Sequence, residues 1–502
     1  MMYAALCHRR VLILAVVLTV AVSSAAWGAT YNVSTVGQLN SALWNARYGD
    51  EVVVAAGTYN LTGVLNMSYQ GVTLRGATGN RDDVILRGSG MNTYGVNEGI
   101  CLNTNYLTVS DLTVKDIYWN AIHIRGENQA SNLTISNVKT WNVGQRHIKG
   151  SGGGGSSAIS DNVLIENCFM LQTEAREQGN SGDNYIGGID AMGVRNWTIR
   201  DNVAQGIRGY DDTGNAAIFL WQGVQNVTIE RNRIYECGKG IGLGNPADPN
   251  TAIFTYPYHA DDITVRNNMV LRSTMGGGNA IILELCNTKD VQVLNNTFYS
   301  HNASYFRTIS PYDENGGGAT TGLDFQANII RGDVWDHAVG DWSIARLTAD
   351  GNIVDTTALV VVPAWFVDWT QANLHLAEAS TAGAVTPVNI AEVLADVPED
   401  FDLALRGNSP DIGADEIILI AGDATLDWRV ELDDLSVLAF YWDTPTDMRW
   451  NNGDFDGDSA VTLADLSILA FNWNVGTAGA IPEPASALLL IAGTAGLIRR
   501  RR

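Results

Sequence analysis

Short runs of alternating apolar and polar residues recur through the middle of the chain, each followed by an asparagine or aspartate. Alternation of this kind predicts a strand with one buried face, and the residue that follows predicts a turn. Successive copies begin about 26 to 36 residues apart, which predicts one such strand per coil of a parallel solenoid. Asparagines at one turn position are expected to stack into a ladder between coils. The copies are residues 106–112, 132–138, 162–168, 196–202, 226–232, 262–268, 290–296 and 322–328.

A second strand-like segment follows these turns. Turns of variable length, rich in glycine and asparagine, separate the two kinds of strand. No long amphipathic helix alternates with the strands, which argues against a doubly wound sheet or a barrel with outer helices. The second strands are residues 121–126, 146–150, 188–193, 217–223, 240–245 and 280–286.

The two ends of this repeat region differ from its middle. Residues 36–63 begin with a helical pattern that includes Leu39 and Leu43, followed by a Gly-Asp turn and the strand-like EVVVAAGTY. This segment resembles the capping helix and first strand of right-handed parallel β-helix proteins of the pectin-lyase-like class. A helix there would cover apolar core and unpaired strand ends. Residues 406–416 resemble the closing motif of many secreted β-helix proteins.

The resemblance implies an all-β fold, a right-handed parallel β-helix solenoid with an N-terminal capping helix, over residues 29–416. It predicts the fold but not an activity, because the class holds lyases, hydrolases, epimerases and non-catalytic binders.

Two acidic loops of twelve residues, 423–434 and 454–465, lie 31 residues apart, and each leads into a near-identical apolar helix, 435–442 or 466–473. Oxygen donors at loop positions 1, 3, 5 and 12 are typical of EF-hand calcium sites. The duplicated loop and helix resemble a type I dockerin domain, which implies a small α-helical calcium module over residues 420–475 and a cohesin-like protein partner. The candidate ligands are Asp423, Thr425, Asp427 and Asp434 in the first loop, and Asp454, Asp456, Asp458 and Asp465 in the second.

The loops depart from the EF-hand pattern at some positions. Thr425 replaces a stronger ligand at position 3, and position 6, which favours glycine for a left-handed turn, holds Trp428 and Ser459. The second loop is therefore the better candidate for calcium. A calcium-stapled spacer without a protein partner is the alternative interpretation.

Both termini carry the pattern of a targeting segment. Residues 1–28 have two arginines, an apolar run over 11–22 and small residues, as a secretory signal peptide does. Residues 481–502 contain Pro-Glu-Pro, an apolar run and four arginines, and resemble a PEP-CTERM sorting signal, which implies processing by an exosortase. A plain membrane anchor is the alternative for this tail. Residues 476–480 are then a linker between the calcium module and the sorting signal. The two terminal signals together predict that the chain is exported and associated with the cell envelope.

Charge and cysteine content narrow the class of partner. The formal net charge of −23 argues against nucleic acid and anionic lipid and suits an extracellular protein that holds calcium. The cysteines beyond the signal peptide lie within apolar strand-like runs, so they are expected to be buried, with disulfides possible but not indicated. These are Cys101, Cys168, Cys237 and Cys286.

A candidate site emerges when the second strands are aligned by their glycines. His123 and Arg125 then point outward, His147 and Lys149 take the same places in the next coil, and Asp190 follows. These five are the candidate catalytic residues. Acidic, basic and aromatic side chains on one elongated face suit a polysaccharide. Candidate substrate-binding residues on or near that face are Trp119, Trp141, Arg146, Arg208, Asp211, Asp212 and Trp221.

Two chemistries could use such a face. A uronate lyase needs a cation beside the carboxylate and a base that takes the proton from carbon 5, roles that the histidines and cations could fill. A glycoside hydrolase needs paired carboxylates, and only Asp190 with Asp211 and Asp212 could supply them. A rod-like glycan binder, or a polar surface without a site, is the further alternative. Lyase action on an acidic polysaccharide is the favoured hypothesis.

Overall fold

The computed structural model describes much of the chain between residues 28 and 475. Residues 1–27 of the predicted signal peptide, the linker, the sorting signal and Asp427 lie outside the described residues. Among the described helices, none is both long and apolar enough to cross a membrane. The internal segments outside the description are 153–157, 181, 183, 246–255, 273–280, 302–306, 314–317, 336–338, 340–341, 378–396, 407–409, 417–419, 426–428, 447, 449 and 457.

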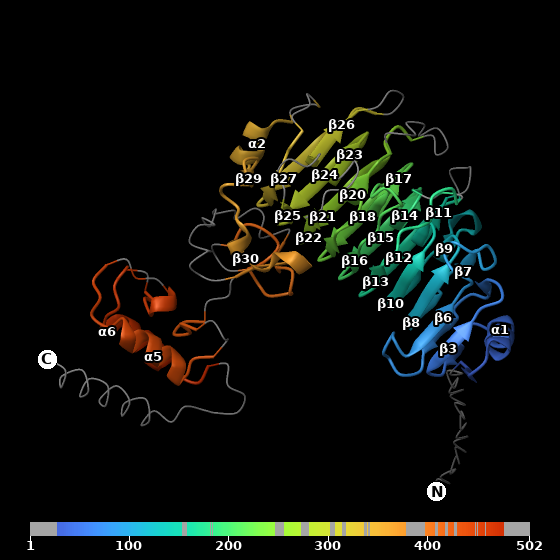
Figure 1. Cartoon of the computed structure of the whole chain (residues 1–502), viewed down its shortest axis with the longest axis horizontal. Helices are drawn as coiled ribbons and strands as arrows, with labels where there is room; N and C mark the ends of the chain where they lie inside the picture. The colour runs from blue at the N-terminus through green and yellow to red at the C-terminus, as the bar shows by residue number, and fades with distance from the viewer. Residues whose placement is uncertain are drawn as a thin grey trace, which may run out of the picture.

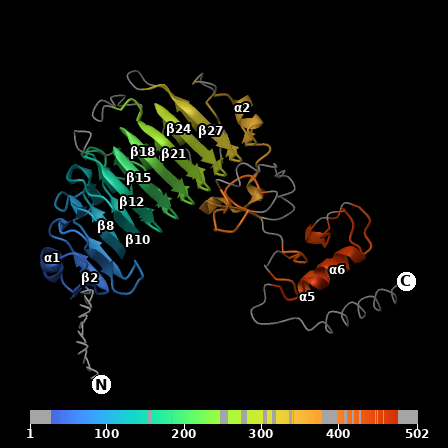
Figure 2. The same ribbon diagram turned by 180° about the vertical axis from the view of Figure 1, so that it is seen from behind.

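Parallel strands stacked coil upon coil form most of the molecule (Figures 1 and 2). Within the described residues they make one sheet of nine strands and one of twenty, and the strand pairs of both sheets are parallel. Successive coils contribute one strand to the nine-stranded sheet and one or two to the other. This confirms the predicted right-handed parallel β-helix.

The nine-stranded sheet carries the candidate site. Its strands are β4 (Leu65–Met67), β7 (Glu98–Leu102), β9 (Asn120–Arg125), β11 (Arg146–Ser151), β14 (Gly187–Met192), β17 (Ala216–Trp221), β20 (Lys239–Leu243), β23 (Ile281–Cys286) and β26 (Arg307–Tyr312).

The twenty-stranded sheet wraps around the rest of each coil. Its strands are β1 (Thr30–Val33), β2 (Glu51–Val54), β3 (Gly57–Asn60), β5 (Thr73–Gly76), β6 (Val84–Arg87), β8 (Thr108–Ile117), β10 (Leu133–Val143), β12 (Ser160–Glu166), β13 (Phe169–Leu171), β15 (Val194–Arg200), β16 (Val203–Gln205), β18 (Val224–Glu230), β19 (Arg233–Tyr235), β21 (Ala260–Arg266), β22 (Met269–Arg272), β24 (Thr288–Leu294), β25 (Thr297–Ser300), β27 (Thr321–Gln326), β28 (Ile329–Arg331) and β29 (Ile353–Asp355).

Short elements complete the described chain. They are the helices α1 (Val36–Asn45), α2 (Ile344–Ala349), α5 (Leu432–Phe440) and α6 (Leu463–Phe471), the antiparallel pair β30 (Phe366–Asp368) and β31 (Asn373–Leu376), and the 3-10 turns η1 (Gly126–Asn128), η3 (Pro363–Trp365), η4 (Trp369–Gln371) and η5 (Trp450–Asn452).

The register of the nine-stranded sheet follows a column of large aliphatic residues in the core. One such residue from each of seven successive strands pairs with its counterpart in the next coil and is at most 1% exposed. A slip of one residue would turn these side chains to solvent, so their burial fixes the pairing. The column consists of Ile122, Ile148, Ile189, Ile218, Ile241, Leu283 and Ile309.

Buried asparagines form the predicted ladder along one turn of the solenoid. The side-chain amide of each member before the last donates to the amide oxygen of the asparagine in the next coil over 2.7 to 3.0 Å. The ladder begins where the backbone N–H of Cys168 donates to Asn202. Its members are Asn202, Asn232, Asn268, Asn296, Asn328 and Asn352.

Replacing Asn268 with alanine is expected to lower the free energy of unfolding by about 2–4 kcal/mol, because buried polar groups lose their partners. Its amide donates to Ile229 O and Asn296 Oδ1, and its oxygen accepts from Asn232 N, all within 3.0 Å. Urea unfolding midpoints measure the loss. The control is Asn60→Ala, an exposed asparagine at the end of β3, for which a change below about 0.5 kcal/mol is expected. Equal losses in the two variants would contradict the role of the ladder.

Helix α1 lies at the N-terminal end of the coils (Figure 1). It begins after Thr35, whose side chain accepts from the backbone N–H of Gln38. Leu39, Ala42 and Leu43 are buried on one face of α1 and belong to the same core cluster as the solenoid strands. The helix therefore extends the hydrophobic core at that end.

The segment around the predicted closing motif contacts the later coils. Arg406 is buried, donates to Asn267 Oδ1 and Gly413 O over 2.9 Å, and pairs with Glu416. The N–H of Ala414 donates to Thr297 Oγ1 of β25. These bonds satisfy backbone and side-chain groups along the side of the later coils.

Helices α5 and α6 begin three residues before the predicted 435 and 466. The reason is a capping box at each start: Glu431 or Thr462 is the N-cap, and Asp434 or Asp465 at the third helical position bonds back to the N-cap N–H. The two helices share one small hydrophobic core, which includes Val430, Leu435, Leu438, Phe455, Val461, Leu466 and Leu469.

Candidate functional site

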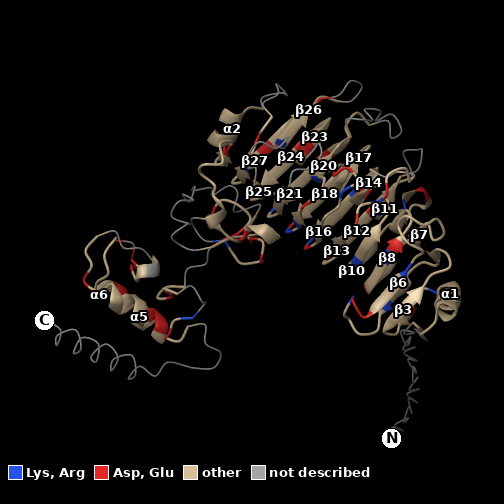
Figure 3. Cartoon of the chain, viewed as in Figure 1, with Lys and Arg blue, Asp and Glu red and all other residues tan. Residues whose placement is uncertain are grey.

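The side chains that point away from the core of the nine-stranded sheet form a continuous column of chemically diverse residues, here called the outer column, and all of them except Lys149 are buried. Paired strands lie about 4.8 Å apart, so side chains from adjacent coils can interact. Basic and acidic residues both lie along the strands of the β-helix (Figure 3). The outer column reads Cys101, His123, Lys149, Asp190, Phe219, Gly242, Glu284 and Ser310.

The predicted register of the two histidine strands is wrong by two residues. Lys149 pairs with His123, and Ser151 pairs with Arg125. His147, which was predicted beside His123, instead lies two residues before Lys149. The outer column therefore contains one histidine and one lysine at this point, and not two histidines.

A glycine caused this error. The alignment equated Gly126 with Gly150 as turn residues, but only Gly126 follows the end of β9, in η1. Gly150 pairs with Ile124 inside the sheet, and a side chain there would lie 2.7 Å from the ring of Trp197. Gly150 leaves room for the buried tryptophan of another coil and does not mark a turn.

His147 is a core residue. It has no exposed surface, its Nδ1 lies 2.7 Å from Thr140 Oγ1, and its Nε2 lies 3.3 Å from Gln172 Oε1. Because the Gln172 oxygen can only accept, Nε2 carries the hydrogen and Nδ1 accepts from the Thr140 hydroxyl. Burial lowers the pKa of His147 to about 4, so it stays neutral. The prediction of His147 as a catalytic surface residue is contradicted.

Buried His147 is expected to make stability fall with acidity. Its pKa drops from 6.5 to about 4 on folding, so its contribution is fully present above pH 6.5 and is lost as pH falls toward 4. The loss is about 3 kcal/mol, from about 2.5 pKa units at 1.36 kcal/mol each. Urea unfolding of the native chain and of His147→Asn at pH 7 and pH 4.5 measures it. The difference between the two proteins should change by most of this amount, and an unchanged difference would contradict the interpretation.

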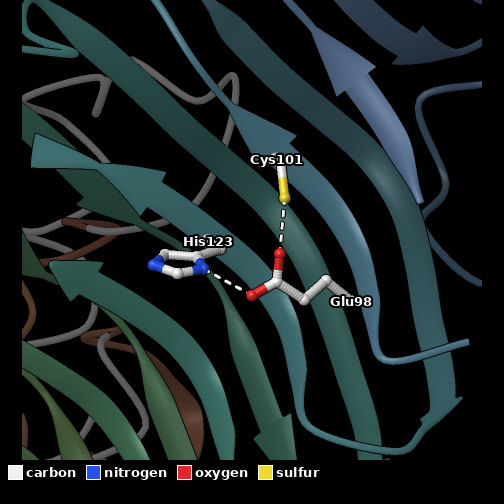
Figure 4. Close-up of side chains that lie close together, drawn as sticks. All are labelled: Glu98, Cys101 and His123. Carbon is white, nitrogen blue, oxygen red and sulfur yellow. Dashed lines mark hydrogen bonds and ion pairs between the residues drawn. The ribbon is translucent and has the colours of Figure 1, made fainter. Parts of the chain in front are cut away.

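Glu98 contacts three side chains of β7 and β9, and Figure 4 shows two of them, Cys101 and His123. Its Oε1 lies 2.6 Å from His123 Nδ1, and its Oε2 lies 2.8 Å from Cys101 Sγ and 2.6 Å from Arg125 Nη2. Burial alone would raise the pKa of Glu98, but the bonds from His123 and Cys101 and the charge of Arg125 lower it to about 2. Glu98 is therefore a carboxylate that only accepts hydrogen bonds.

The donor types of this cluster could also suit a transition-metal ion. Ligand atoms of Glu98, Cys101 and His123 all lie within 4.8 Å of one another. However, Arg125 Nη2 already contacts both Glu98 and Cys101 Sγ, at 2.6 and 3.7 Å. Burial and the neighbouring Glu98 raise the pKa of the Cys101 thiol to about 12, so it is protonated. The geometry fits a charge-balanced hydrogen-bond network better than a metal centre.

Lys149 lies at the centre of the site, between His123 and Asp190 in the outer column. Among the described residues, no hydrogen bond or ion pair reaches its ammonium group. Burial, together with the nearby charge of Arg146, lowers its pKa, while Asp190 opposes that shift. Lys149 is therefore a partly buried amine that gives up its proton more readily than an ordinary lysine.

Asp190 is engaged on both oxygens. Arg146 Nε donates to Oδ2, and Trp221 Nε1 donates to Oδ1 over 3.0 Å. Asp190 is 3% exposed, and Arg146 has no exposed surface. The Tyr185 ring covers the guanidinium at 3.4 Å, and the Tyr185 carbonyl accepts from it. Arg146, predicted as a substrate contact beside the strand, is a buried strand residue that holds Asp190.

The predicted aromatic residues separate into two groups. Trp221 stacks on Phe219 with ring centroids 5.6 Å apart, and Trp119 directly precedes β9, so both belong to the side of the nine-stranded sheet. Trp141 lies on β10 of the other sheet, with Lys115 Nζ 3.7 Å from its ring centroid. Trp141 therefore does not join the outer column.

Arg208, Asp211 and Asp212 follow strand β16 as a separate cluster. Arg208 pairs with Asp212 at 3.1 Å, and Asp211 Oδ1 accepts from Thr213 Oγ1 at 2.6 Å. No hydrogen bond or ion pair within the described chain joins them to Asp190. Both oxygens of Asp190 already accept from buried donors.

Sequence reasoning missed Glu98 and Ser151. Ser151 Oγ lies 2.9 Å from His123 Nε2, and Glu98 holds the other ring nitrogen. The signal that could have found both is the core column, because aligning Ile122 with Ile148 and Ile100 sets the strands in their true register.

The second acidic loop of the C-terminal module brings three carboxylates together. Carboxylate oxygens of Asp454, Asp456 and Asp458 lie within 4.8 Å of one another. Asp465 Oδ1 accepts from the N–H of Phe455 and Asp456, which ties position 12 to the loop backbone. The oxygen-rich set fits a hard cation such as calcium.

Position 6 of the second loop adopts the left-handed backbone that the EF-hand pattern expects, since Ser459 has φ of 71°. In the first loop Asp434 Oδ1 accepts from Ala424 N, Thr425 N and Thr425 Oγ1, each at 2.9 Å. Thr425 thus supports the loop through Asp434.

Several solved structures are similar to part of this chain. No family model and no curated protein matches the chain. Alginate lyase from Paenibacillus sp. str. FPU-7 is similar over 59% of this chain and 99% of its own, with 17% identity and a TM-score of 0.37. Polygalacturonase from Erwinia carotovora ssp. carotovora is similar over 62% and 90%, with 14% identity and a TM-score of 0.37. PfbA, a surface adhesin of Streptococcus pneumoniae, is similar over 60% and 76%, with 13% identity and a TM-score of 0.39.

These similarities concern the fold alone. The chain is a right-handed parallel β-helix protein whose candidate site is the outer column of the nine-stranded sheet. The chemistry of that site rests on its own side chains.

Proposed function

We propose that this protein binds an acidic polysaccharide along the outer face of the nine-stranded sheet and cleaves it by β-elimination, with Lys149 as the general base. The observation that carries the proposal is the position of Lys149, a partly buried and unpaired amine among the described residues, between His123 and Asp190 in the outer column. A base of lowered pKa on a long, partly basic face is what proton abstraction from a uronate needs.

Each group of the site has one role in the proposed elimination. The neutral amine of Lys149 takes the proton from carbon 5, the electrons form a double bond to carbon 4, and the sugar oxygen at carbon 4 leaves and takes a proton from water. The partly exposed guanidinium of Arg125 offers a positive charge to the uronate carboxylate. The Arg146–Asp190 pair fixes the strand that bears Lys149, and the stacked Phe219 and Trp221 border the site.

A non-catalytic glycan binder is the second candidate. It is favoured by the pairing of the carboxylates on this face: Glu98 with Arg125, Asp190 with Arg146, and Glu284 with Lys239 at 2.8 Å. A surface satisfied in this way, with an aromatic pair beside it, can bind sugar without chemistry.

A panel assay separates the candidates. The purified chain is incubated with pectate, alginate and chondroitin in calcium, and three readouts are followed: ultraviolet absorbance of unsaturated uronide, new reducing ends, and retention on immobilised polysaccharide. Absorbance with new reducing ends is the expected result. New reducing ends without absorbance indicate a hydrolase. Retention with neither signal overturns the elimination and supports the binder.

For the C-terminal module we propose calcium binding by Asp454, Asp456 and Asp458, and attachment to a cohesin-like protein. The clustered carboxylates support calcium, and the exposed Phe440 and Phe471 at equivalent ends of α5 and α6 support a protein partner. Calcium is expected to raise the melting temperature of the module's transition in the intact chain. An Asp454→Asn, Asp456→Asn variant should lose that response, and an undiminished response would contradict the site.

A further inference from the structure

Three side chains from consecutive coils line up as an acid, a base and a hydroxyl. Glu98 of β7 lies 2.6 Å from Nδ1 of His123 on β9, and Nε2 of His123 lies 2.9 Å from Oγ of Ser151 at the end of β11. This is the arrangement of an activated nucleophile: a hydroxyl in contact with an imidazole, and the imidazole held by a third group. The elimination proposed above uses none of these three residues.

The hydrogen-bond partners of His123 determine which of its ring nitrogens carries the hydrogen. Glu98 is ionised and accepts only, so Nδ1 of His123 must carry a hydrogen. In the neutral ring, Nε2 then carries a free lone pair, and this nitrogen faces the hydroxyl of Ser151. Arg125 and Cys101 also donate to Glu98, at 2.6 and 2.8 Å, which locks the carboxylate in place. His123 is 4% exposed and Ser151 is half-buried, so a buried ring lies beside a serine that is partly accessible to solvent.

We propose that Glu98, His123 and Ser151 form a nucleophilic triad that hydrolyses carboxylic esters, removing small acyl groups from sugar hydroxyls. The choice of an acylated polysaccharide as the natural substrate rests on the proposed function, but the triad itself does not. Acyl groups next to the scissile bond would hinder the elimination proposed at Lys149, which lies on the same strand β11 as Ser151, so their removal is a reaction that suits this face.

The reaction balances without a cofactor. Ser151 Oγ attacks the acyl carbon as His123 Nε2 takes the hydroxyl proton, and the tetrahedral intermediate expels the sugar oxygen, which receives that proton from Nε2. Water then attacks the acyl-serine with Nε2 again as the base. The products are the free sugar hydroxyl and a carboxylic acid, and Ser151 regains its proton.

Glu127 competes for the same hydroxyl. Oε2 of Glu127 accepts from Ser151 Oγ, and the carbonyl oxygen of Ile124 lies 3.3 Å from the same Ser151 Oγ. Hydrogen bonds from Ser151 and Arg125 lower the pKa of Glu127 against the effect of burial, so Glu127 is an ionised acceptor. Since one proton cannot serve two acceptors, removing the charge of Glu127 should shift the hydroxyl toward His123.

The test uses the full chain with p-nitrophenyl acetate and with an acetylated polyuronate. Ser151→Ala and His123→Gln are expected to reduce ester hydrolysis by on the order of 10³-fold, and Glu127→Gln to keep or raise it. The matched control is Ser136→Ala, because Ser136 Oγ contacts the carboxylate of Glu166 at 3.4 Å and, among the residues that the structure describes, has no histidine as a hydrogen-bond partner.

Two further readouts separate chemistry from folding and from the proposed function. A fluorophosphonate should label the native chain once, at Ser151, by mass spectrometry, and labelling at Ser136 or nowhere overturns the triad. Ser151→Ala should retain elimination, and Lys149→Ala should retain ester hydrolysis. Wild-type ester hydrolysis by a folded Ser151→Ala overturns the triad alone, whereas absent elimination in the native chain overturns the proposed function alone.

Discussion

Replacing Lys149 with alanine is expected to reduce the elimination rate by about 10²–10⁴-fold, the usual contribution of a general base. The amine must be neutral to accept the proton, so the rate in the native chain should rise with pH through the pKa of Lys149. Because burial and Arg146 lower that pKa, the rise should occur at lower pH than for an ordinary lysine. Initial rates of ultraviolet absorbance from pH 6 to 11 measure both effects.

The control for this prediction is Lys139→Ala. Lys139 lies on β10 of the twenty-stranded sheet, pairs with Asp82 at 2.8 Å, and should leave the rate unchanged. Lys149→Arg keeps the positive charge but cannot act as a base near neutral pH, so it should be as inactive as the alanine variant. An arginine variant with native activity would show that Lys149 supplies charge and not proton transfer.

Replacing Arg146 with leucine is expected to destabilise the protein by about 3–5 kcal/mol, because Asp190 is left as a buried charge without its main partner. Arg146 has no exposed surface and Asp190 is 3% exposed, so water cannot take over the lost bonds. Trp221 Nε1 alone would remain as a hydrogen-bond donor to the carboxylate. The loss is measured from urea unfolding midpoints.

The double variant Arg146→Leu, Asp190→Leu tests the cause. Removing both charges eliminates the uncompensated group, so most of the lost stability should return. The surface pair Arg195 and Asp161, at 3.4 Å, provides the comparison, and Arg195→Leu should change stability by less than about 1 kcal/mol. If the double variant is less stable than Arg146→Leu, the ion pair is not what holds Asp190.

The architecture could be predicted because each coil repeats the same local chemistry. The apolar alternation, the asparagine at the turn and the helical pattern around Leu39 each indicate a local structure, and the asparagine ladder from Asn202 to Asn352 confirms the stacking. Helices α5 and α6 began earlier than predicted because the apolar pattern does not reveal the capping boxes of Asp434 and Asp465.

The site could be predicted only in part, because its geometry depends on register between coils of unequal length. Lys149 lies 26 residues after its partner His123, whereas Asp190 lies 41 residues after Lys149, so no fixed spacing identifies the neighbours. Gly150 resembled a turn, although it makes room for Trp197 from another coil. Such a tertiary contact cannot be recognised from the local sequence pattern. The resulting error in register predicted His147 at the surface, although it lies in the core.

We propose that an acidic polysaccharide lies on the outer column with Lys149 at its centre. The most direct measurement is amine acetylation of the intact chain, with and without a saturating polyuronate, read residue by residue by mass spectrometry. We expect the polymer to protect Lys149 while Lys139 on the other sheet is acetylated to the same extent. If Lys149 is acetylated to the same extent with and without polymer, although the chain still binds the polymer, this location of the site is contradicted.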